Sequence, residues 1–339
     1  MDNWVGCRLP VAIDRPVVHI CAGPVARRPG RDDRDRMTHR IEDDGEIVSR
    51  TALLDRGLSD GQIRRARERG ELVPLLPVLY LRGEGPARLD PASRHRARLT
   101  TVIACLAGEP VVSHVSAAIV HGLPFGHSEI PPLHVTRREP GRARPGAPVR
   151  VHRAALESAE VVDLGGVRVT SPERTVVDCA LSLPFDHAVV VADAALRRGL
   201  VTRRSLQDQL ARRDRVPGRR RAGAVLAFAD PRSRGPGESF SRVLLHRWGF
   251  AVADLAVPVP DQRGRPVGVF AFRFAGHRVV GEFLEQAPDS SAGTGSGPEE
   301  TELAVRAAGW RLVRWSWPEL RSPEPWVHRL RLELARVAA

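Results

Sequence analysis

Residues 45 to 81 carry helix start signals that restrict this part of the chain to one small fold. Ser49 has the position of a cap for a short first helix. Ser59 and Gln62 have the three-residue spacing of a capping box at the start of a second helix. The apolar, Pro-punctuated residues 71 to 83 then predict the two strands of a wing. This order of elements predicts a winged helix-turn-helix.

The second predicted helix combines an apolar inner face, Ile63 and Ala66, with four basic residues. These are Arg64, Arg65, Arg67 and Arg69. A helix of this kind can enter a major groove and contact the phosphates beside it. A solvated basic helix is the alternative. The capped helices and the wing favour DNA, so we predict a winged-helix DNA reader over residues 37 to 84.

The charge of the chain also points to a polyanionic partner. The formal net charge is +12, and all 52 basic residues are arginine. Neutralising phosphates releases counterions, which favours binding of a basic protein to double-stranded DNA. A GC-rich coding bias would produce the same arginine excess without selection for DNA. The absence of lysine excludes a Schiff-base or general-base lysine, since arginine stays protonated.

The distribution of apolar residues and cysteines indicates a cytoplasmic protein without a membrane partner. No apolar run approaches the roughly 20 residues needed to cross a bilayer, and the first residues lack a signal pattern. The four cysteines form no CxxC pair, which argues against a zinc knuckle or a disulfide framework. Residues 1 to 36 are interpreted as a disordered tail or a misassigned start upstream of Met37.

Residues 85 to 215 are expected to form a central α/β region. His114 and His121 lie seven residues apart on one predicted helix. Zinc-binding histidines on a helix are usually four apart, so we expect packing or capping and predict no metal. Asp178, within an apolar helical stripe, is expected to be a buried structural acid. Residues 216 to 236 are interpreted as an Arg-rich linker.

Residues 237 to 339 predict a mixed sheet flanked by helices. A helix is followed by three apolar strands, a Gly/Ser loop, a helix, a strand and a last helix. Together with the segments before it, this order predicts a mixed α/β fold for the whole chain.

Several stretches carry a family resemblance. The back half contains GESFSRVLLHRWGF (237–250), HRVVGEFLE (277–285) and AAGWRLVRWSWPEL (307–320). The front contains GLSDGQIRRARERGELVPL (57–75) and TSPERTVVDCA (170–180). In this order they resemble a bacterial family with a very-short-patch-repair-like, restriction-endonuclease-like C-terminal domain. Its members often begin with the winged helix of AbiEi-type (type IV) antitoxins.

The resemblance implies a nuclease centre that has lost most of its acids. Such a centre holds Mg²⁺ between carboxylates at the ends of adjacent strands. The first strand acid of the family falls on Ala271, and the next strand retains Glu282 but lacks the expected Asp. The lysine that the family places after it is also absent. Glu238 matches the family's first helix, with an i, i+4 surface salt bridge to Arg242 as the alternative interpretation.

Three hypotheses follow. The first is a DNA-binding autoregulator of the antitoxin type, with a degenerate endonuclease-like domain, no cofactor and a toxin protein as a candidate partner. The second is an active Mg²⁺-dependent endonuclease that uses Glu238, Glu282 and Glu285. The third is a structural or protein-interaction module whose basic charge reflects genome composition.

Overall fold

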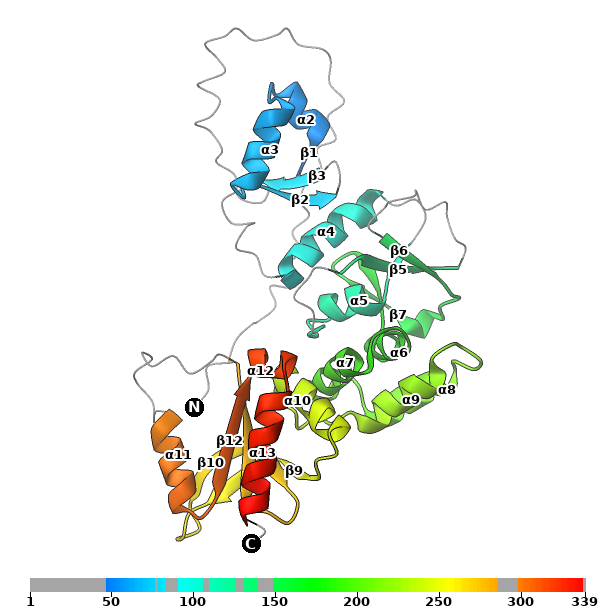
Figure 1. Cartoon of the computed structure of the whole chain (residues 1–339). Coiled ribbons are helices and arrows are strands. Elements are labelled where there is room, and N and C mark those ends of the chain that lie inside the picture. Colours follow the sequence, from blue (N-terminus) through cyan, green and yellow to red (C-terminus); the bar gives the residue numbers. More distant parts are fainter. Residues whose placement is uncertain are drawn as a thin grey trace. The chain divides into compact units, whose positions relative to one another are not determined.

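The computed structural model describes residues 47–76, 79–82, 91–105, 110–125, 131–138, 149–285 and 298–337. They form two compact units (Figure 1). The first unit ends at Thr170, and the second begins at Ser171 and includes the short segment 121–125. Both units combine helices with sheets, so the predicted mixed α/β class is confirmed. The predicted tail, residues 1 to 36, lies outside the described residues.

The N-terminal elements contain the two predicted helices and the predicted hairpin in order, preceded by a strand, β1, that was not predicted. They are β1 (Ile47–Ser49), α2 (Arg50–Asp55), α3 (Asp60–Glu68), β2 (Leu72–Leu76) and β3 (Leu79–Arg82). Ser49 Oγ accepts a hydrogen bond from the Ala52 amide at 3.0 Å and caps α2. Ser59 and Gln62 form the complete capping box of α3. The strands make an antiparallel sheet in the order β1-β3-β2, onto which α3 buries Ile63.

The rest of the first unit is built on a five-stranded sheet of order β6-β5-β4-β8-β7. Its elements are α4 (Pro91–Cys105), β4 (Val111–Val112), α5 (His114–Val120), β5 (Leu133–Arg137), β6 (Val149–Arg153), η3 (Ser158–Glu160), β7 (Val161–Leu164) and β8 (Val167–Thr170). Helices α4 and α5 contribute Leu99 and Ala117 to a core with Val112 and Leu133. Strands β5 and β6 run parallel at one edge of the sheet.

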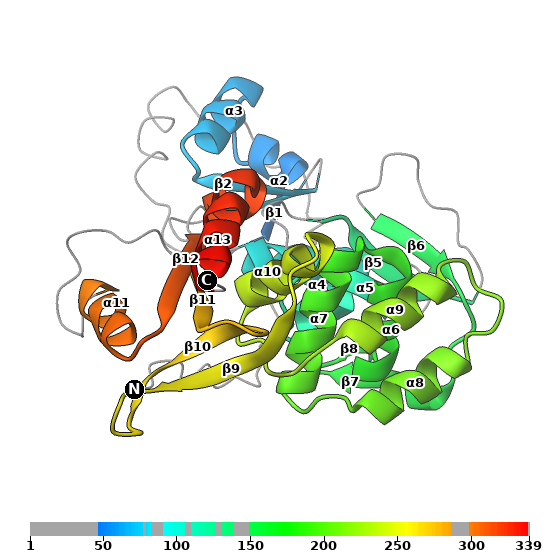
Figure 2. The same cartoon turned by 60° about the horizontal axis from the view of Figure 1, so that its bottom comes forward.

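Four helices open the second unit. They are α6 (Pro172–Ser182), α7 (Phe185–Arg197), α8 (Arg203–Ala211) and α9 (Arg219–Phe228). Figure 2 shows them packed together as a layer. Asp178 of α6 is 2% exposed and accepts hydrogen bonds from Arg174 Nε, which confirms it as a buried structural acid. Among the described residues, no helix has the length and apolar character needed to cross a membrane.

The structure differs from the prediction over residues 216 to 236. This segment, interpreted as a linker, contains helix α9, whose Ala222 and Val225 are fully buried. The run of arginines at the start of α9 made the segment resemble a polar linker, because the apolar face of the helix begins only at Ala222. The predicted boundary between a central region and a back domain therefore does not hold, because α6 to α9 belong to the same compact unit as the residues that follow.

The C-terminal elements match the predicted order and form a four-stranded sheet, β12-β11-β10-β9. They are α10 (Pro236–Arg247), β9 (Val252–Pro260), β10 (Pro266–Phe274), β11 (Val279–Leu284), α11 (Pro298–Ala307), β12 (Arg311–Ser316), α12 (Trp317–Arg321) and α13 (Glu324–Val337). Strands β9 to β11 pair antiparallel, whereas β11 and β12 pair parallel after the α11 crossover. Helix α12 is an element that the sequence did not indicate.

Helices cover both faces of this sheet. On one face, Leu245 of α10 and Trp326 of α13 share a core with Trp315 of β12. On the other face, Val305 of α11 packs with Val280 of β11. Because side chains alternate along a strand, neighbouring residues of β11 face different helices. This alternation along β11 determines which side of the sheet the predicted acid Glu282 faces.

Candidate functional site

Helix α3 presents the predicted arginines to solvent. Its inner face is closed by Ile63 and Ala66, which are 3% and 6% exposed. Arg64, Arg65 and Arg67 are exposed around the remaining surface of the helix. The helix is short, capped at both ends and fixed to the sheet, so these side chains project from a rigid support.

The fourth predicted arginine has a different role. Arg69 lies at the C-terminal cap of α3, and its Nη2 donates to Glu71 Oε2 at 2.9 Å, while its Nε donates to Glu71 Oε1. The Arg69 guanidinium holds the pKa of Glu71 below its usual range through these hydrogen bonds. The pair joins the end of α3 to the start of the hairpin. Arg69 is therefore better suited to fixing the hairpin than to contacting phosphate.

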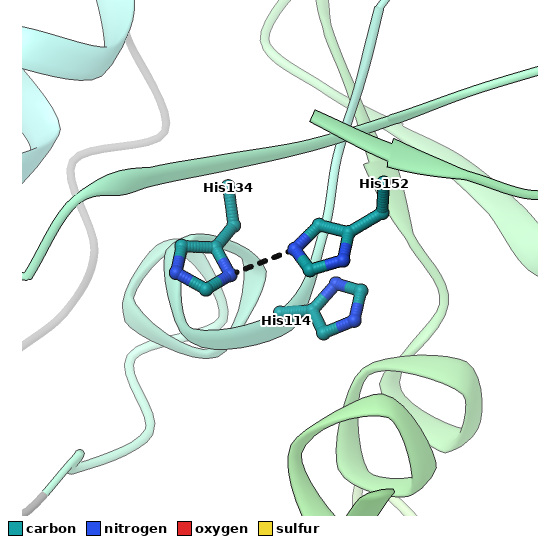
Figure 3. A group of neighbouring side chains, drawn as sticks. All are labelled: His114, His134 and His152. Atoms are coloured by element: carbon teal, nitrogen blue, oxygen red, sulfur yellow. Dashed lines mark hydrogen bonds between the residues drawn. The ribbon is translucent and has the colours of Figure 1, made fainter. Parts of the chain in front are cut away.

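Three histidines meet in the first unit (Figure 3). His114 begins α5, His134 lies in β5 and His152 lies in β6. Nε2 of His152 is 3.0 Å from Nδ1 of His134, and the rings of His114 and His152 stack with centroids 3.6 Å apart. His114 and His134 are buried, whereas His152 is half-buried.

This arrangement changes the interpretation of His114. The sequence places His114 and His121 on one predicted helix, but α5 ends at Val120 and the partners of His114 come from two strands. The signal that could have found them was a histidine in each of two apolar strand segments, LHVTR and VRVHR. Burial lowers the pKa of His134 to about 3 and that of His152 to about 4, so both rings are neutral at neutral pH.

Glu282, the acid retained from the implied nuclease centre, is already paired with a cation. It lies in register with Arg314 of β12, whose Nε donates to Glu282 Oε2 at 2.9 Å. Both side chains face α11, where Glu302 approaches Arg314 to 3.9 Å. Ala271 stands at the implied position of the first strand acid and is 2% exposed. The guanidinium of Arg314 therefore takes the place beside the Glu282 carboxylate that a divalent ion would need.

Glu238 is not brought together with Glu282. Its carboxylate accepts from the backbone and side chain of Arg234, at 2.7 and 2.8 Å. The preceding Gly237 packs so closely on Phe283 that an added Cβ would lie 2.0 Å from the ring. Phe283 and Glu282 alternate along β11, so Glu238 lies on the side of the sheet opposite Glu282. Among the described residues, Glu238 and Glu282 do not fit a Mg²⁺ centre, because they lie apart and each is paired with an arginine.

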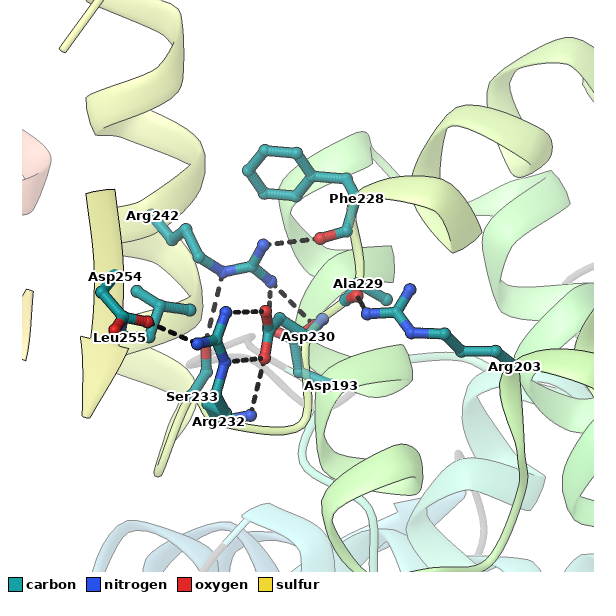
Figure 4. A network of polar contacts seen from close by, with 10 residues as sticks. All are labelled: Asp193, Arg203, Phe228, Ala229, Asp230, Arg232, Ser233, Arg242, Asp254 and Leu255. Carbon is teal, nitrogen blue, oxygen red and sulfur yellow. Dashed lines mark hydrogen bonds and ion pairs between the residues drawn. The ribbon is translucent and has the colours of Figure 1, made fainter. Parts of the chain in front are cut away.

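The alternative interpretation of Arg242, a surface salt bridge, is wrong. Instead of a surface salt bridge with Glu238, Arg242 forms a buried pair with Asp193 of α7, with Nη2 2.8 and 2.7 Å from the two carboxylate oxygens (Figure 4). Asp193 also accepts from Ser239 Oγ and from the Asp230 amide, both at 2.7 Å. Burial raises the pKa of Asp193, opposed by the nearby Arg242. The network ties α7 to α10, which explains why the predicted domain boundary fails.

A basic cavity of about 350 Å³ opens beside the edge strand β12. Its arginines come from α11, β12 and α13, and two glutamates also line it. The charged lining residues are Glu302, Arg306, Arg311, Arg314, Arg329, Glu333 and Arg336. The excess of arginine makes this cavity a candidate contact for an anionic group.

Comparisons with known proteins give relatives but no function. No family model matches the chain. It is 27% identical over 168 residues to two proteins of Mycobacterium tuberculosis, Uncharacterized protein MT2308 and Uncharacterized protein Rv2248. The match covers 49% of this chain and 60% of the length of those relatives. Among solved structures, the RV2827C protein from Mycobacterium tuberculosis aligns over 58% of this chain and 75% of its own, with a TM-score of 0.34 and 18% identity.

Proposed function

We propose that this chain binds double-stranded DNA, with α3 as the helix that enters the major groove. The observation that carries the proposal is the projection of Arg64, Arg65 and Arg67 from a capped helix whose opposite face is buried. The β2–β3 hairpin follows α3 in the place of a wing. Arginine binds phosphate oxygens and guanine edges through a planar fork of donors, which suits both positioning and sequence reading.

The second unit supports binding rather than cutting. Its Glu282 is neutralised by Arg314, and its Glu238 is engaged by Arg234. The arginine-lined cavity beside β12 offers a further contact for phosphate. We therefore propose a cytoplasmic regulator that represses its own operon in the manner of the AbiEi-type antitoxins that the sequence resembles. A toxin protein is the partner that this proposal implies.

The proposal is tested by measuring the binding of the full chain to duplex DNA from its own upstream region. The affinity should fall as salt rises, with a slope of roughly −0.9 in log–log form for each phosphate neutralised. A duplex of the same length and unrelated sequence serves as the control. Absence of binding, or binding that does not weaken with salt, contradicts the proposal.

A further inference from the structure

The three histidines of the first unit have the chemistry and the placement of a metal site. One ring nitrogen from each histidine can serve as a ligand, and these three nitrogens all lie within 4.8 Å of one another. Two ligands of a tetrahedral zinc ion with Zn–N bonds of about 2.1 Å lie roughly 3.4 Å apart. The closest pair here, His134 Nδ1 and His152 Nε2, is separated by 3.0 Å. The side chains must rotate to place all three nitrogens around one ion, because the rings of His114 and His152 are stacked in this structure.

The backbone fixes two of the three ligands on one face of the sheet. In the parallel register of β5 and β6, His152 lies opposite Thr136, which is two residues from His134. Residues two apart share a face, so His134 and His152 are diagonal neighbours on it. A β-sheet is a rigid support, and ligands held in this way lose little freedom when an ion binds.

The third ligand is aimed at the other two by an unusual backbone conformation. His114 has a φ of 54°, in the left-handed region that residues with a side chain seldom adopt. Such a conformation persists where the surrounding structure imposes it, and it is often found at ligand-binding positions. In this conformation the His114 ring stacks on His152 at a centroid distance of 3.6 Å.

A hydrogen-bonded chain behind His114 orients its ring. His114 Nδ1 lies 2.9 Å from Ser113 Oγ, and Ser113 Oγ accepts from Thr136 Oγ1 at 2.8 Å. With a metal on Nε2, the Nδ1–H group donates to Ser113. Outer partners of this kind fix the tautomer and the ring orientation of metal-ligating histidines.

We propose that His114, His134 and His152 bind one Zn²⁺ ion and leave its fourth position to water or a small anionic ligand. Imidazole suits zinc, and three protein ligands with one exchangeable position are typical of zinc sites that act on a bound molecule. Among the described residues, no carboxylate or thiolate joins the group, so the bound ion keeps its positive charge. That charge favours an anion at the fourth position.

The test measures Zn²⁺ and Co²⁺ binding to the full chain, prepared without an affinity tag and freed of metal. We expect one equivalent of either ion per chain, and an absorption spectrum of the Co²⁺ form that is typical of tetrahedral coordination. Two variants each remove one ligand. His152→Gln alters the half-buried ligand. His114→Gly removes the ligand of α5 and keeps the left-handed backbone conformation, which glycine adopts without strain. Each should weaken Zn²⁺ binding by more than about 100-fold, because an entire coordination bond is lost.

His328→Ala is the matched control, since His328 is an exposed histidine of α13. It should bind Zn²⁺ as the unaltered chain does. Circular dichroism and thermal unfolding without metal show whether each variant is folded, and Zn²⁺ should raise Tm only in the unaltered chain and the control. The proposal is overturned if the folded chain binds neither ion stoichiometrically. It is also overturned if folded His152→Gln and His114→Gly retain the affinity of the control.

Discussion

Arg314 and Glu282 stand opposite each other on the parallel strands β12 and β11, joined by a hydrogen bond of 2.9 Å. Their side chains are 17% and 24% exposed, so the pair is largely shielded from water. Removal of the arginine would leave the carboxylate without its cation. The pair leaves Glu282 without the free negative charge that a metal ligand at this position would need.

The first prediction concerns the stability of this pair. Arg314→Met should lower the free energy of unfolding by roughly 1–3 kcal/mol, because Glu282 is left partly buried and unpaired. Adding Glu282→Gln should recover part of that loss. Urea denaturation of the two single variants and the double variant measures the coupling. Strictly additive losses would show that the two residues do not interact.

The second prediction concerns the buried pair of Asp193 and Arg242. Arg242→Met should destabilise the second unit by about 3–5 kcal/mol, since it leaves the Asp193 carboxylate, which is 0% exposed, without its cation. Arg204→Met provides the matched control, because Arg204 pairs with Asp208 on the surface of α8 and contributes at most about 0.5 kcal/mol. Equal effects of the two substitutions on urea unfolding would refute the structural role assigned to the network.

The third prediction concerns acid stability through His95. This side chain is 0% exposed, and burial, together with the nearby charge of Arg98, lowers its pKa from 6.5 to about 4. The folded state therefore resists protonation, while the unfolded state takes up a proton below about pH 6.5. Stability should be fully present above pH 6.5 and should decline as the pH falls towards 4. His134 and His152 act in the same direction.

The lowering of the His95 pKa corresponds to roughly 3 kcal/mol of stability lost over this interval. Urea unfolding at several pH values between 4 and 8 measures the decline. His95→Gln should make the decline less steep, because glutamine does not titrate, while the contributions of His134 and His152 remain. An unchanged pH dependence in that variant would show that His95 is not the residue responsible.

Local signals made the N-terminal elements predictable from the sequence. Ser59 and Gln62 act within one helical turn, so their spacing alone predicts the capping box that the structure shows. Apart from α12, the order of strands and helices after α10 was predictable for the same reason, since each element carries its own periodicity.

Partnerships across long stretches of chain were not predictable in this way. The partner of Arg242 is 49 residues away on α7, whereas the spacing in the sequence offered Glu238, four residues away on the same helix, as an alternative partner. The histidine cluster joins three segments of the first unit, and no spacing along the chain encodes it. Tertiary packing determines these contacts. In both cases it brings together residues that are distant in sequence instead of the local pairs, Arg242 with Glu238 and His114 with His121.

The most direct test of DNA binding through α3 compares two sets of charge reversals by fluorescence anisotropy on the same upstream duplex. The first set is Arg64→Glu, Arg65→Glu and Arg67→Glu. The second set reverses three exposed arginines of the other unit, namely Arg220, Arg263 and Arg278, and lowers the net charge equally. The first set should weaken binding by more than about 100-fold, because three charge-assisted contacts are lost. The second set should have a much smaller effect, and an equal loss in both sets would contradict a DNA-reading role for α3.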